Sequence, residues 1–365
     1  MRRKISLKPI TLFLLLITFA SYGKEQEGHG EEKTGKTTKE EVKEYIQHHL
    51  KDSYDFNLFS YTTDEGESKH VGFPLPVILW DNGLKVFSSS KFHHGETVAE
   101  VGGDYYKLHH SKIYKVDGAN GEVLEDEHHH ATNEKPLDFS ITKNVSLIFL
   151  VFGIMFFMFS RMAKAYKNNS GMPKGTGRFL EPIVLYVRDE IAIPNIGEKH
   201  YKRYMSYLLT VFFFVWIINL FGLTPIGMNL TNNIAVTLCL ALITYFITTF
   251  SGNKNYWKHI FWMPGVPVPM KIILAPIELL GTIIKPFALM IRLYANITAG
   301  HVVLMSIIGM IFLFQNWLGS SLSLLLAFVL AILELLVAAL QAYIFTVLSA
   351  LYFGMAVEEH HDEAH

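Results

Sequence analysis

The chain has 365 residues, half of them hydrophobic, and a formal net charge of -1 at pH 7. This near-neutral balance gives no reason to expect nucleic acid among its partners. Its single cysteine excludes a fold that depends on intramolecular disulfides.

The acidic residues are unevenly distributed along the chain. Of the 33 acidic residues, 23 fall in residues 24–138 and four lie after residue 356, which leaves only six in residues 139–356. Four of those six share one polar stretch, so Glu278 and Glu334 stand alone among apolar residues. The distribution predicts an acidic, soluble front and a membrane-embedded back.

The first residues, MRRKISLKPITLFLLLITFASYG, combine a basic start with a short apolar run that ends in small residues. This order is typical of a secretory signal peptide, and the apolar run is short for a membrane span. We therefore predict a signal peptide over residues 1–23, with an uncleaved anchor as the alternative. With either kind of segment, the residues after it are expected to lie outside the cytoplasm.

Residues 24–136 are predicted to form an acidic, His-rich, exported (periplasmic) domain with β-structure. PVILWDNGLKVFSSS holds two β-prone runs around Asn82-Gly83, which is a strong hairpin signal, and YKVDGANGEVL repeats the pattern more weakly. Upstream, GEEKTGKT in residues 30–37 fits a phosphate-loop pattern. We interpret it as a chance match, because no apolar strand precedes it.

Histidines recur in this region as adjacent pairs or triplets: His48-His49, His93-His94, His109-His110 and His128-His129-His130. They fit surface residues without a dedicated role, proton buffers near pH 6 to 7, or metal ligands. None has zinc-finger spacing with cysteine, and neighbours along a strand point to opposite faces. All three interpretations stay open, and the sequence assigns no metal or cofactor.

The chain then becomes a series of apolar runs. Residues 144–160, 204–226 and 229–250 predict three membrane spans. The loop over residues 161–203 carries nine Lys or Arg against four acidic residues, and the loop over residues 251–271 has lysines without acids. The positive-inside rule makes both loops cytoplasmic. Within the first loop, residues 177–197 suit a helix at the membrane surface or equally a core-facing loop.

The last two apolar runs are longer than one membrane crossing. Residues 272–318 would extend about 70 Å as a helix and residues 318–357 about 60 Å, against a hydrocarbon thickness of about 30 Å. We predict a long, tilted helical hairpin, with a kink at Pro286, a turn at residues 319–321 and a cytoplasmic C-terminus. The fold class is an all-α polytopic membrane protein with about five membrane helices, plus the small exported β-containing domain.

This hairpin carries ionisable residues within apolar surroundings. Glu278, Lys285 and Arg292 recur every seven residues, so they share one stripe of the helix, and Asn296 lies one turn further on. Each charge is expected to face water, a partner or another charge, because it would cost roughly 2.5–3.5 kcal/mol at a bilayer centre. His301 points nearly opposite to Arg292 if the helix is regular. The stripe favours an ion pathway, with a structural Arg-Glu pair as the alternative.

At these residues the chain resembles a known family. PIELLGTIIKPFALMIRLYANITAGHVVL and AILELLVAALQAYIFTVLSALYF, in this order, resemble subunit a of the F-type ATP synthase, the membrane stator that faces a rotating ring of c subunits. The resemblance runs over about residues 137–361. We predict a membrane domain of this kind over residues 137–365.

The resemblance implies a role at the rotor for three residues. Arg292 corresponds to the essential stator arginine, which keeps a passing c-subunit carboxylate ionised and blocks a proton shortcut between two half-channels. Asn296 and Gln341 correspond to its polar neighbours at the rotor interface.

The resemblance also implies that three further residues line the proton channels. His301 and Glu334 correspond to the histidine and acid of the outer channel, and Glu278 corresponds to the acid of the channel to the cytoplasm. The implied subunit is not an enzyme by itself and needs no cofactor. The implied partners are the c-ring, the b subunits of the peripheral stalk, the rest of the complex, the lipid of a bacterial inner membrane, and protons, with Na⁺ not excluded as the coupling ion.

Two other classes of protein share some of these features. A secondary transporter uses embedded charges too, but usually shows internal repeats, and none is found here. A metal transporter or metal-binding module would explain the histidine pairs. Neither explains two consecutive over-long helices that each carry polar residues.

Overall fold

The computed structural model describes residues 52–62, 68–95, 97–126, 131–168, 175–224, 230–263, 266–313 and 317–358. Several sequence-based predictions fall outside these ranges: the signal peptide over residues 1–23, the phosphate-loop match, two of the histidine clusters and the end of the C-terminal tail. The described residues form two compact units, one of strands and one mainly of helices, and each is described by itself.

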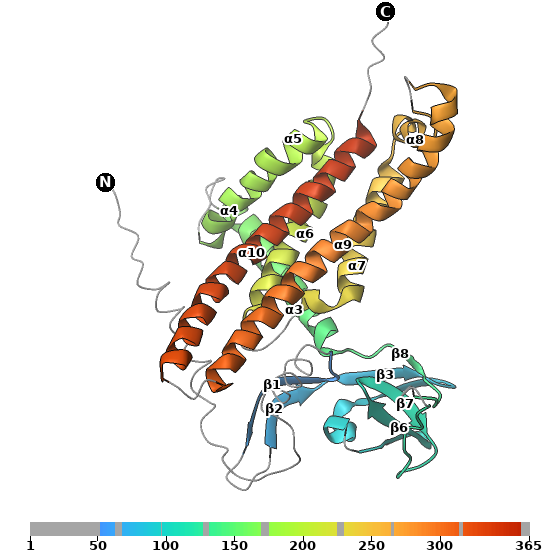
Figure 1. The fold of residues 1–365 in the computed structure, drawn as a ribbon, viewed down its shortest axis with the longest axis vertical. Coiled ribbons are helices and arrows are strands. Elements are labelled where there is room, and N and C mark those ends of the chain that lie inside the picture. Colours follow the sequence, from blue (N-terminus) through green and yellow to red (C-terminus); the bar gives the residue numbers. More distant parts are fainter. Residues whose placement is uncertain are drawn as a thin grey trace, which may run out of the picture. The chain divides into compact units, whose positions relative to one another are not determined.

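The strand unit contains three small antiparallel sheets (Figure 1). One pairs two strands, and the others have the orders β4-β3-β8 and β5-β6-β7. The strands are β1 (Asp55–Thr62), β2 (Ser68–Pro74), β3 (Pro76–Trp80), β4 (Leu84–Ser88), β5 (Ala99–Val101), β6 (Asp104–His109), β7 (Lys112–Val116) and β8 (Leu137–Asp138), with a 3-10 helix, η1 (Ser89–Gly95), after β4.

The hairpin predicted around Asn82-Gly83 is present. β3 pairs with β4 in register from Pro76↔Ser88 to Trp80↔Leu84. The turn needs left-handed backbone, and Asn82 has φ 50° while Gly83 has φ 142°. These are residue types that adopt positive φ at low cost, which explains why this signal was reliable.

The weaker hairpin, in YKVDGANGEVL, is wrong. β7 does precede the DGANG turn, but its partner is β6, through a turn at His110 and Ser111. After the DGANG turn the chain pairs with a later segment instead, through the isolated bridge Glu125↔Ala131. Leu124 stays exposed there, so the downstream run has no buried apolar face to hold it against β7.

The core of the strand unit lies between the β3-containing and β6-containing sheets. Its buried residues are Tyr54, Val77, Leu79, Phe87, Phe92, Ala99, Tyr106 and Ile113. The burial of β3 alternates, with Val77 and Leu79 fully buried, which is the period-two pattern expected of a half-buried strand.

A charged cluster lies beside this core. Asp81 accepts hydrogen bonds from Tyr106 Oη at 2.7 Å and Lys115 Nζ at 2.8 Å. Asp104 pairs with Lys115 at 3.1 Å and also with Lys85. The cluster joins residues of both sheets, so it stabilises their packing in a region whose described residues contain no disulfide.

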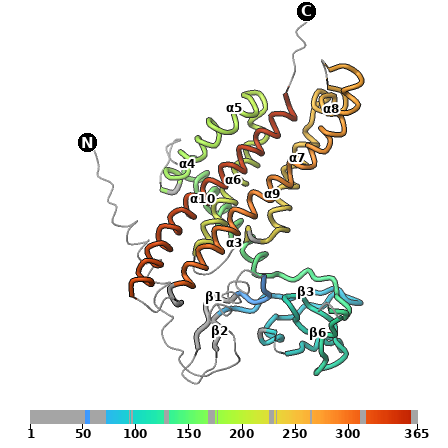
Figure 2. Tube along the Cα trace, viewed as in Figure 1, coloured from blue at the N-terminus to red at the C-terminus, as the bar shows by residue number. Residues whose placement is uncertain are grey.

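The helical unit holds the apolar part of the chain (Figures 1 and 2). Its helices are α3 (Lys143–Asn168), α4 (Thr176–Tyr186), the π-helical η2 (Val187–Ala192), α5 (Ile193–Ile196), α6 (Tyr201–Gly222), η3 (Leu230–Asn232), α7 (Ile234–Ser251), α8 (Lys254–Phe261), α9 (Val268–Leu313) and α10 (Trp317–Val357). Five described helices, α3, α6, α7, α9 and α10, are long and apolar enough to cross a membrane. The predicted number of spans is confirmed.

The long helical hairpin is also present, with its turn in a different place. α9 ends at Leu313 and α10 begins at Trp317, so the predicted turn at residues 319–321 is wrong. Gly319 and the serines after it lie in the first turns of α10, where small residues are tolerated. Pro286 does not end α9, which continues through it as one helix.

Close packing holds the helical unit together around α6 and α10. Tyr204 of α6 stacks on Phe353 of α10 with ring centroids 4.7 Å apart. A Cβ added to Gly354 would lie 1.9 Å from the backbone oxygen of Asn195, so only glycine allows α5 to approach α10 this closely. The stretch over residues 177–197, for which a surface helix and a core-facing loop were both open, is helical as far as Ile196, and its η2 and α5 parts pack on α10.

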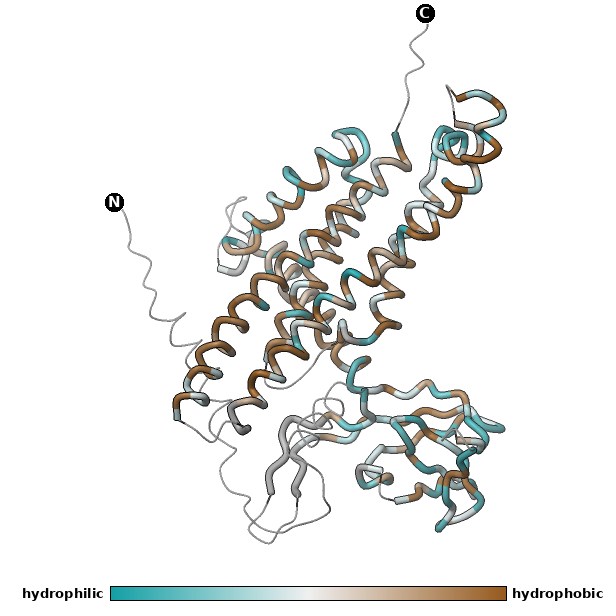
Figure 3. The backbone as a smooth tube through the Cα atoms, in the orientation of Figure 1, coloured by the Kyte–Doolittle hydropathy of each residue, from teal (hydrophilic) through white to brown (hydrophobic). Residues whose placement is uncertain are grey.

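The long helices are more hydrophobic than the strands. Figure 3 shows hydrophobic residues along most of α9 and α10, and mixed colours over the strands. Many large apolar side chains of the hairpin are exposed, such as Ile272, Ile284 and Leu322. An exposed apolar surface of this length requires lipid or other membrane subunits as its surroundings.

The charged cluster generates a prediction about pH. The hydrogen bonds from Lys115 and Tyr106 lower the pKa of Asp81 below its ordinary value of 3.8. A depressed pKa contributes stability above the unfolded value of 3.8, and this contribution is lost as the pH falls through the lower folded value. Replacing Asp81 by Asn is expected to lower the free energy of unfolding of the strands by on the order of 1.5–3 kcal/mol at neutral pH.

Hydrogen exchange of β3, β4, β6 and β7 in the full chain, compared between pH 3 and 6, measures this effect. D117N, at an exposed aspartate of the same region, is the control. Equal protection in D81N and D117N would contradict the proposed stabilisation.

Candidate functional site

The site lies on the α9–α10 hairpin, where two apolar helices run side by side. Arg292 is near the middle of α9 and is exposed on the surface of the chain, as is Asn296 one turn later. Among the described residues, no carboxylate forms an ion pair with Arg292. The guanidinium and the Asn296 amide therefore share an open face that can receive a polar group from outside this chain.

Gln341 fixes the second helix against this position. Its side chain is buried, with 2% exposure, and its Nε2 donates to the backbone oxygen of Arg292 at 2.8 Å. The sequence predicted Gln341 as a polar neighbour of Arg292, and the structure brings the two together. Gln341 touches the backbone of Arg292 from between the helices and is not on the open face with Asn296.

A polar cavity of about 300 Å³ lies on one side of Arg292 along α9. Residues of α8, α9 and α10 line it, among them Lys258, Glu278, Thr282 and Lys285. Glu278 is 14 positions before Arg292, which is about 21 Å along the helix. The cavity is wide enough for several water molecules and brings Glu278 together with Lys285.

A smaller space of about 10 Å³ adjoins this cavity and shares Tyr256, Thr282 and Lys285 with it. It reaches Pro286 and Leu289, and Leu289 precedes Arg292 by less than one turn. The sequence interpretation did not include Tyr256 and Thr282, because each is unremarkable in its own segment until separate helices bring the two together.

A second polar group lies on the other side of Arg292. His301 is buried, with 8% exposure, and follows Arg292 by nine positions, or about 14 Å of helix. Arg292 is exposed and His301 is buried on the same uninterrupted helix, and their opposite orientation stays a prediction. A Cβ on Gly300 would lie 2.9 Å from Glu334 Oε1, so glycine leaves the space that this carboxyl occupies beside α9.

Glu334 comes from α10 and is partly buried, and its Oε2 has no hydrogen-bond partner among the described residues. Asn219 of α6 is buried too, with 4% exposure, and neither atom of its amide has a described partner. Sequence reasoning missed Asn219, although a lone amide within FFFVWIINLFGL is itself a signal. Polar groups left without partners in an apolar interior indicate water or a transported ion.

None of these residues forms a group suited to hold a metal ion. Among the described residues, the side chains that are close enough to share one belong to the strand unit. The arrangement on the helices instead offers an exposed permanent cation with separate polar regions before and after it along α9. Such an arrangement suits a group of side chains that binds and releases protons.

Comparison with known proteins identifies the helical unit. Residues 145–354 match the family described as ATP synthase A chain. The chain belongs to this family. Residues 45–139 match a second family, described only as a domain of unknown function.

Relatives extend the match. The ATP synthase subunit a of Chloroherpeton thalassium is 41% identical over 237 residues, covering 62% of this chain and 70% of that protein. That of Myxococcus xanthus is 41% identical over 236 residues, or 62% and 77% of the two chains. That of Anaeromyxobacter sp. strain Fw109-5 is 38% identical over 274 residues, or 70% and 66%.

The predicted resemblance to subunit a is therefore confirmed. This chain is therefore a multi-pass membrane protein with the five described apolar helices, and it is a membrane-sector subunit that is not itself catalytic.

The hydrogen bond of Gln341 gives a prediction. Gln341→Met keeps the length of the side chain but removes the donor, and it is expected to reduce the stability of the hairpin by about 0.5–1.5 kcal/mol. Thr346→Val is the matched control, because Thr346 is also buried on α10 but donates within its own helix, to Ala342 O at 2.7 Å. The thermal unfolding midpoint of the full chain in micelles measures both. Equal midpoints in the two variants would contradict a role for Gln341 between the helices.

Proposed function

We propose that this chain is the proton-channel stator of an F-type ATP synthase, in which Arg292 separates two half-channels that exchange protons with a rotating ring of c subunits. Family membership supports the stator role in general terms. The observation that carries the finer proposal is the exposed Arg292 between two polar regions on the same hairpin.

Arg292 acts by its permanent charge. A c-subunit carboxylate that crosses lipid must be neutral, and beside a guanidinium its ionised form is favoured, so it releases its proton there. The same charge repels a proton that would pass directly between the half-channels. Asn296 adds a polar contact on the open face, and Gln341 positions the backbone of Arg292 from behind.

Each half-channel uses the polar residues on one side of Arg292. Glu278, in the cavity at α8, leads protons to the cytoplasm. His301 and Glu334 lead them from the outside, and Asn219 offers a further contact for water. Because the two regions are offset along α9, a proton that enters through one must be carried by the rotating c-ring before it can leave through the other. The membrane potential supplies about 2.3 kcal/mol per proton for each 100 mV.

The organisation of the chain follows from this role. Residues 1–23 are a signal peptide, residues 24–136 an exported domain in the periplasm, and residues 137–365 the membrane domain in a bacterial inner membrane, with a cytoplasmic C-terminus. Partners are the c-ring, the b subunits of the peripheral stalk and the remaining subunits, which carry the ATP chemistry. Protons are the coupling ion.

Arg292→Ala tests the central claim. ATP-driven proton pumping in vesicles with the complete complex is expected to fall to background, because a passing carboxylate is no longer kept ionised. Arg203→Ala, at an exposed arginine of α6, is expected to pump normally. Normal pumping by Arg292→Ala, in a complex shown to retain the c-ring, would refute the stator mechanism.

Sidedness gives an independent prediction. With the single cysteine, Cys239, replaced by Ala, a cysteine at Glu278 is expected to react with a small impermeant thiol reagent only from the cytoplasmic side. A cysteine at Glu334 is expected to react only from the periplasmic side. Ile284→Cys, at an exposed apolar residue of the same helix, is the control and should react from neither side. Reaction of both test cysteines from one side would exclude two opposed channels.

A further inference from the structure

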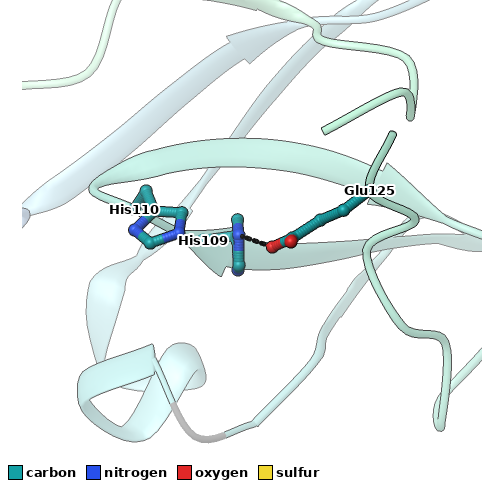
Figure 4. A group of neighbouring side chains, drawn as sticks. All are labelled: His109, His110 and Glu125. Atoms are coloured by element: carbon teal, nitrogen blue, oxygen red, sulfur yellow. Dashed lines mark ion pairs between the residues drawn. The ribbon is translucent and has the colours of Figure 1, made fainter. Parts of the chain in front are cut away.

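Two adjacent histidines meet a glutamate in the strand unit (Figure 4). His109 ends β6, and His110 and Ser111 make the turn to β7 with φ values of 48° and 60°. Because the backbone is left-handed at His110, the alternation of a strand stops there. The rings of His109 and His110 therefore lie together, with centroids 4.1 Å apart, and do not point to opposite faces as expected of neighbours along a strand.

The glutamate is Glu125, which lies 15 residues after His110 and is held by a network of backbone contacts. Glu125 bridges to Ala131, and Thr132 N donates to Leu124 O at 2.8 Å. Asn133 Nδ2 then donates to the backbone of β7, at Lys115 O, at 3.0 Å. These contacts fix the segment that carries Glu125 beside the β6–β7 hairpin.

The three side chains converge. Their candidate ligand atoms all lie within 4.8 Å of one another, and His109 Nε2 is 2.9 Å from Glu125 Oε1. His109 Nε2 is buried, yet no hydrogen bond of acceptable geometry reaches it among the described residues. A buried imidazole nitrogen close to a carboxylate, but not aligned for a hydrogen bond, is suited to share an ion with it.

We propose that His109, His110 and Glu125 form a binding site for a divalent transition-metal ion of the Zn²⁺ type. Two imidazoles and one carboxylate are a ligand set that suits Zn²⁺, with the fourth tetrahedral position left to water. Zn²⁺ holds such ligands at about 2.0–2.2 Å, which places tetrahedral ligand atoms roughly 3.4 Å apart. His109 Nε2 and Glu125 Oε1, at 2.9 Å, must therefore separate slightly, while atoms near the 4.8 Å limit must approach by about 1–1.5 Å. His110 and Glu125 are exposed and can rotate, while His109 is partly buried and anchors the site.

The ion would add a side-chain link between two parts of the strand unit that are otherwise held together by the hydrogen bonds around Asn133 and Thr132. It would tie the β6–β7 turn to the Glu125 segment, in a domain whose described residues contain no cysteine to do so. The proposal concerns the strand unit alone and does not depend on the stator mechanism.

Zn²⁺ titration of the metal-free full chain in micelles, in competition with a chromogenic chelator, tests the site. We expect one tightly bound Zn²⁺ per chain, and at least tenfold weaker binding in His109→Ala and in Glu125→Gln. The matched control replaces both His93 and His94, another adjacent pair in the same region, by Ala, and it should bind as the parent chain does. Other histidines contribute the same background to every variant.

Glu125→Gln keeps the size of an exposed side chain, so it separates loss of a ligand from loss of folding, which circular dichroism checks in each variant. Zn X-ray absorption should report two imidazole nitrogens and a carboxylate oxygen. Equal affinity in the parent chain, Glu125→Gln and the control would overturn the proposal, and so would a parent chain without a tight site. Either result would leave His109 and Glu125 as an ion pair only.

Discussion

A guanidinium that cannot lose its proton lies near the middle of a helix of 46 residues, and the rest of the helical unit depends on this charge. At the centre of a bilayer it would cost roughly 2.5–3.5 kcal/mol. A carboxylate of the same chain would offset this cost, but none pairs with Arg292 among the described residues. The charge is therefore left for water and for a partner that arrives from outside.

The remaining polar groups are arranged around this requirement. Gln341 uses its amide on the backbone of Arg292, which holds the helices together without neutralising the charge. The carboxyls, Glu278 and Glu334, lie on either side and do not approach it. A structural Arg-Glu pair, which the sequence left open, would need one of them at ion-pair distance. The geometry instead favours the interpretation of the stripe as part of an ion pathway.

The sequence was sufficient to predict the five spans and the long hairpin, because the lengths of the apolar runs determine them directly. It was not sufficient to locate the turn between α9 and α10. Glycine and serine are common in turns, but a helix also accepts them, and here Gly319 and the serines after it lie within α10. The polar surroundings of Asn219, Tyr256 and Thr282 could not be predicted, because they are formed by helices that lie far apart in the sequence. The sequence resemblance implied Gln341 as a polar neighbour of Arg292, but it did not predict that Gln341 would donate a hydrogen bond to the backbone oxygen of Arg292.

In the strand unit, one turn follows from its local sequence and another depends on interactions between residues far apart in the chain. The β3–β4 hairpin was predicted from Asn82-Gly83, residue types that adopt positive φ at low cost. The turn of the β6–β7 hairpin uses His110 and Ser111, which adopt positive φ less readily. Such a turn persists only where other interactions hold it, and here β7 is fixed by its pairing with β6 and by the contact of Lys115 with Asp81. The strain places His110 beside His109, so a feature without a sequence signal creates the convergence of ligands. In a small strand unit whose described residues include no cysteine, charges and a bound ion are physically suited to provide the cross-links that disulfides supply in other small domains.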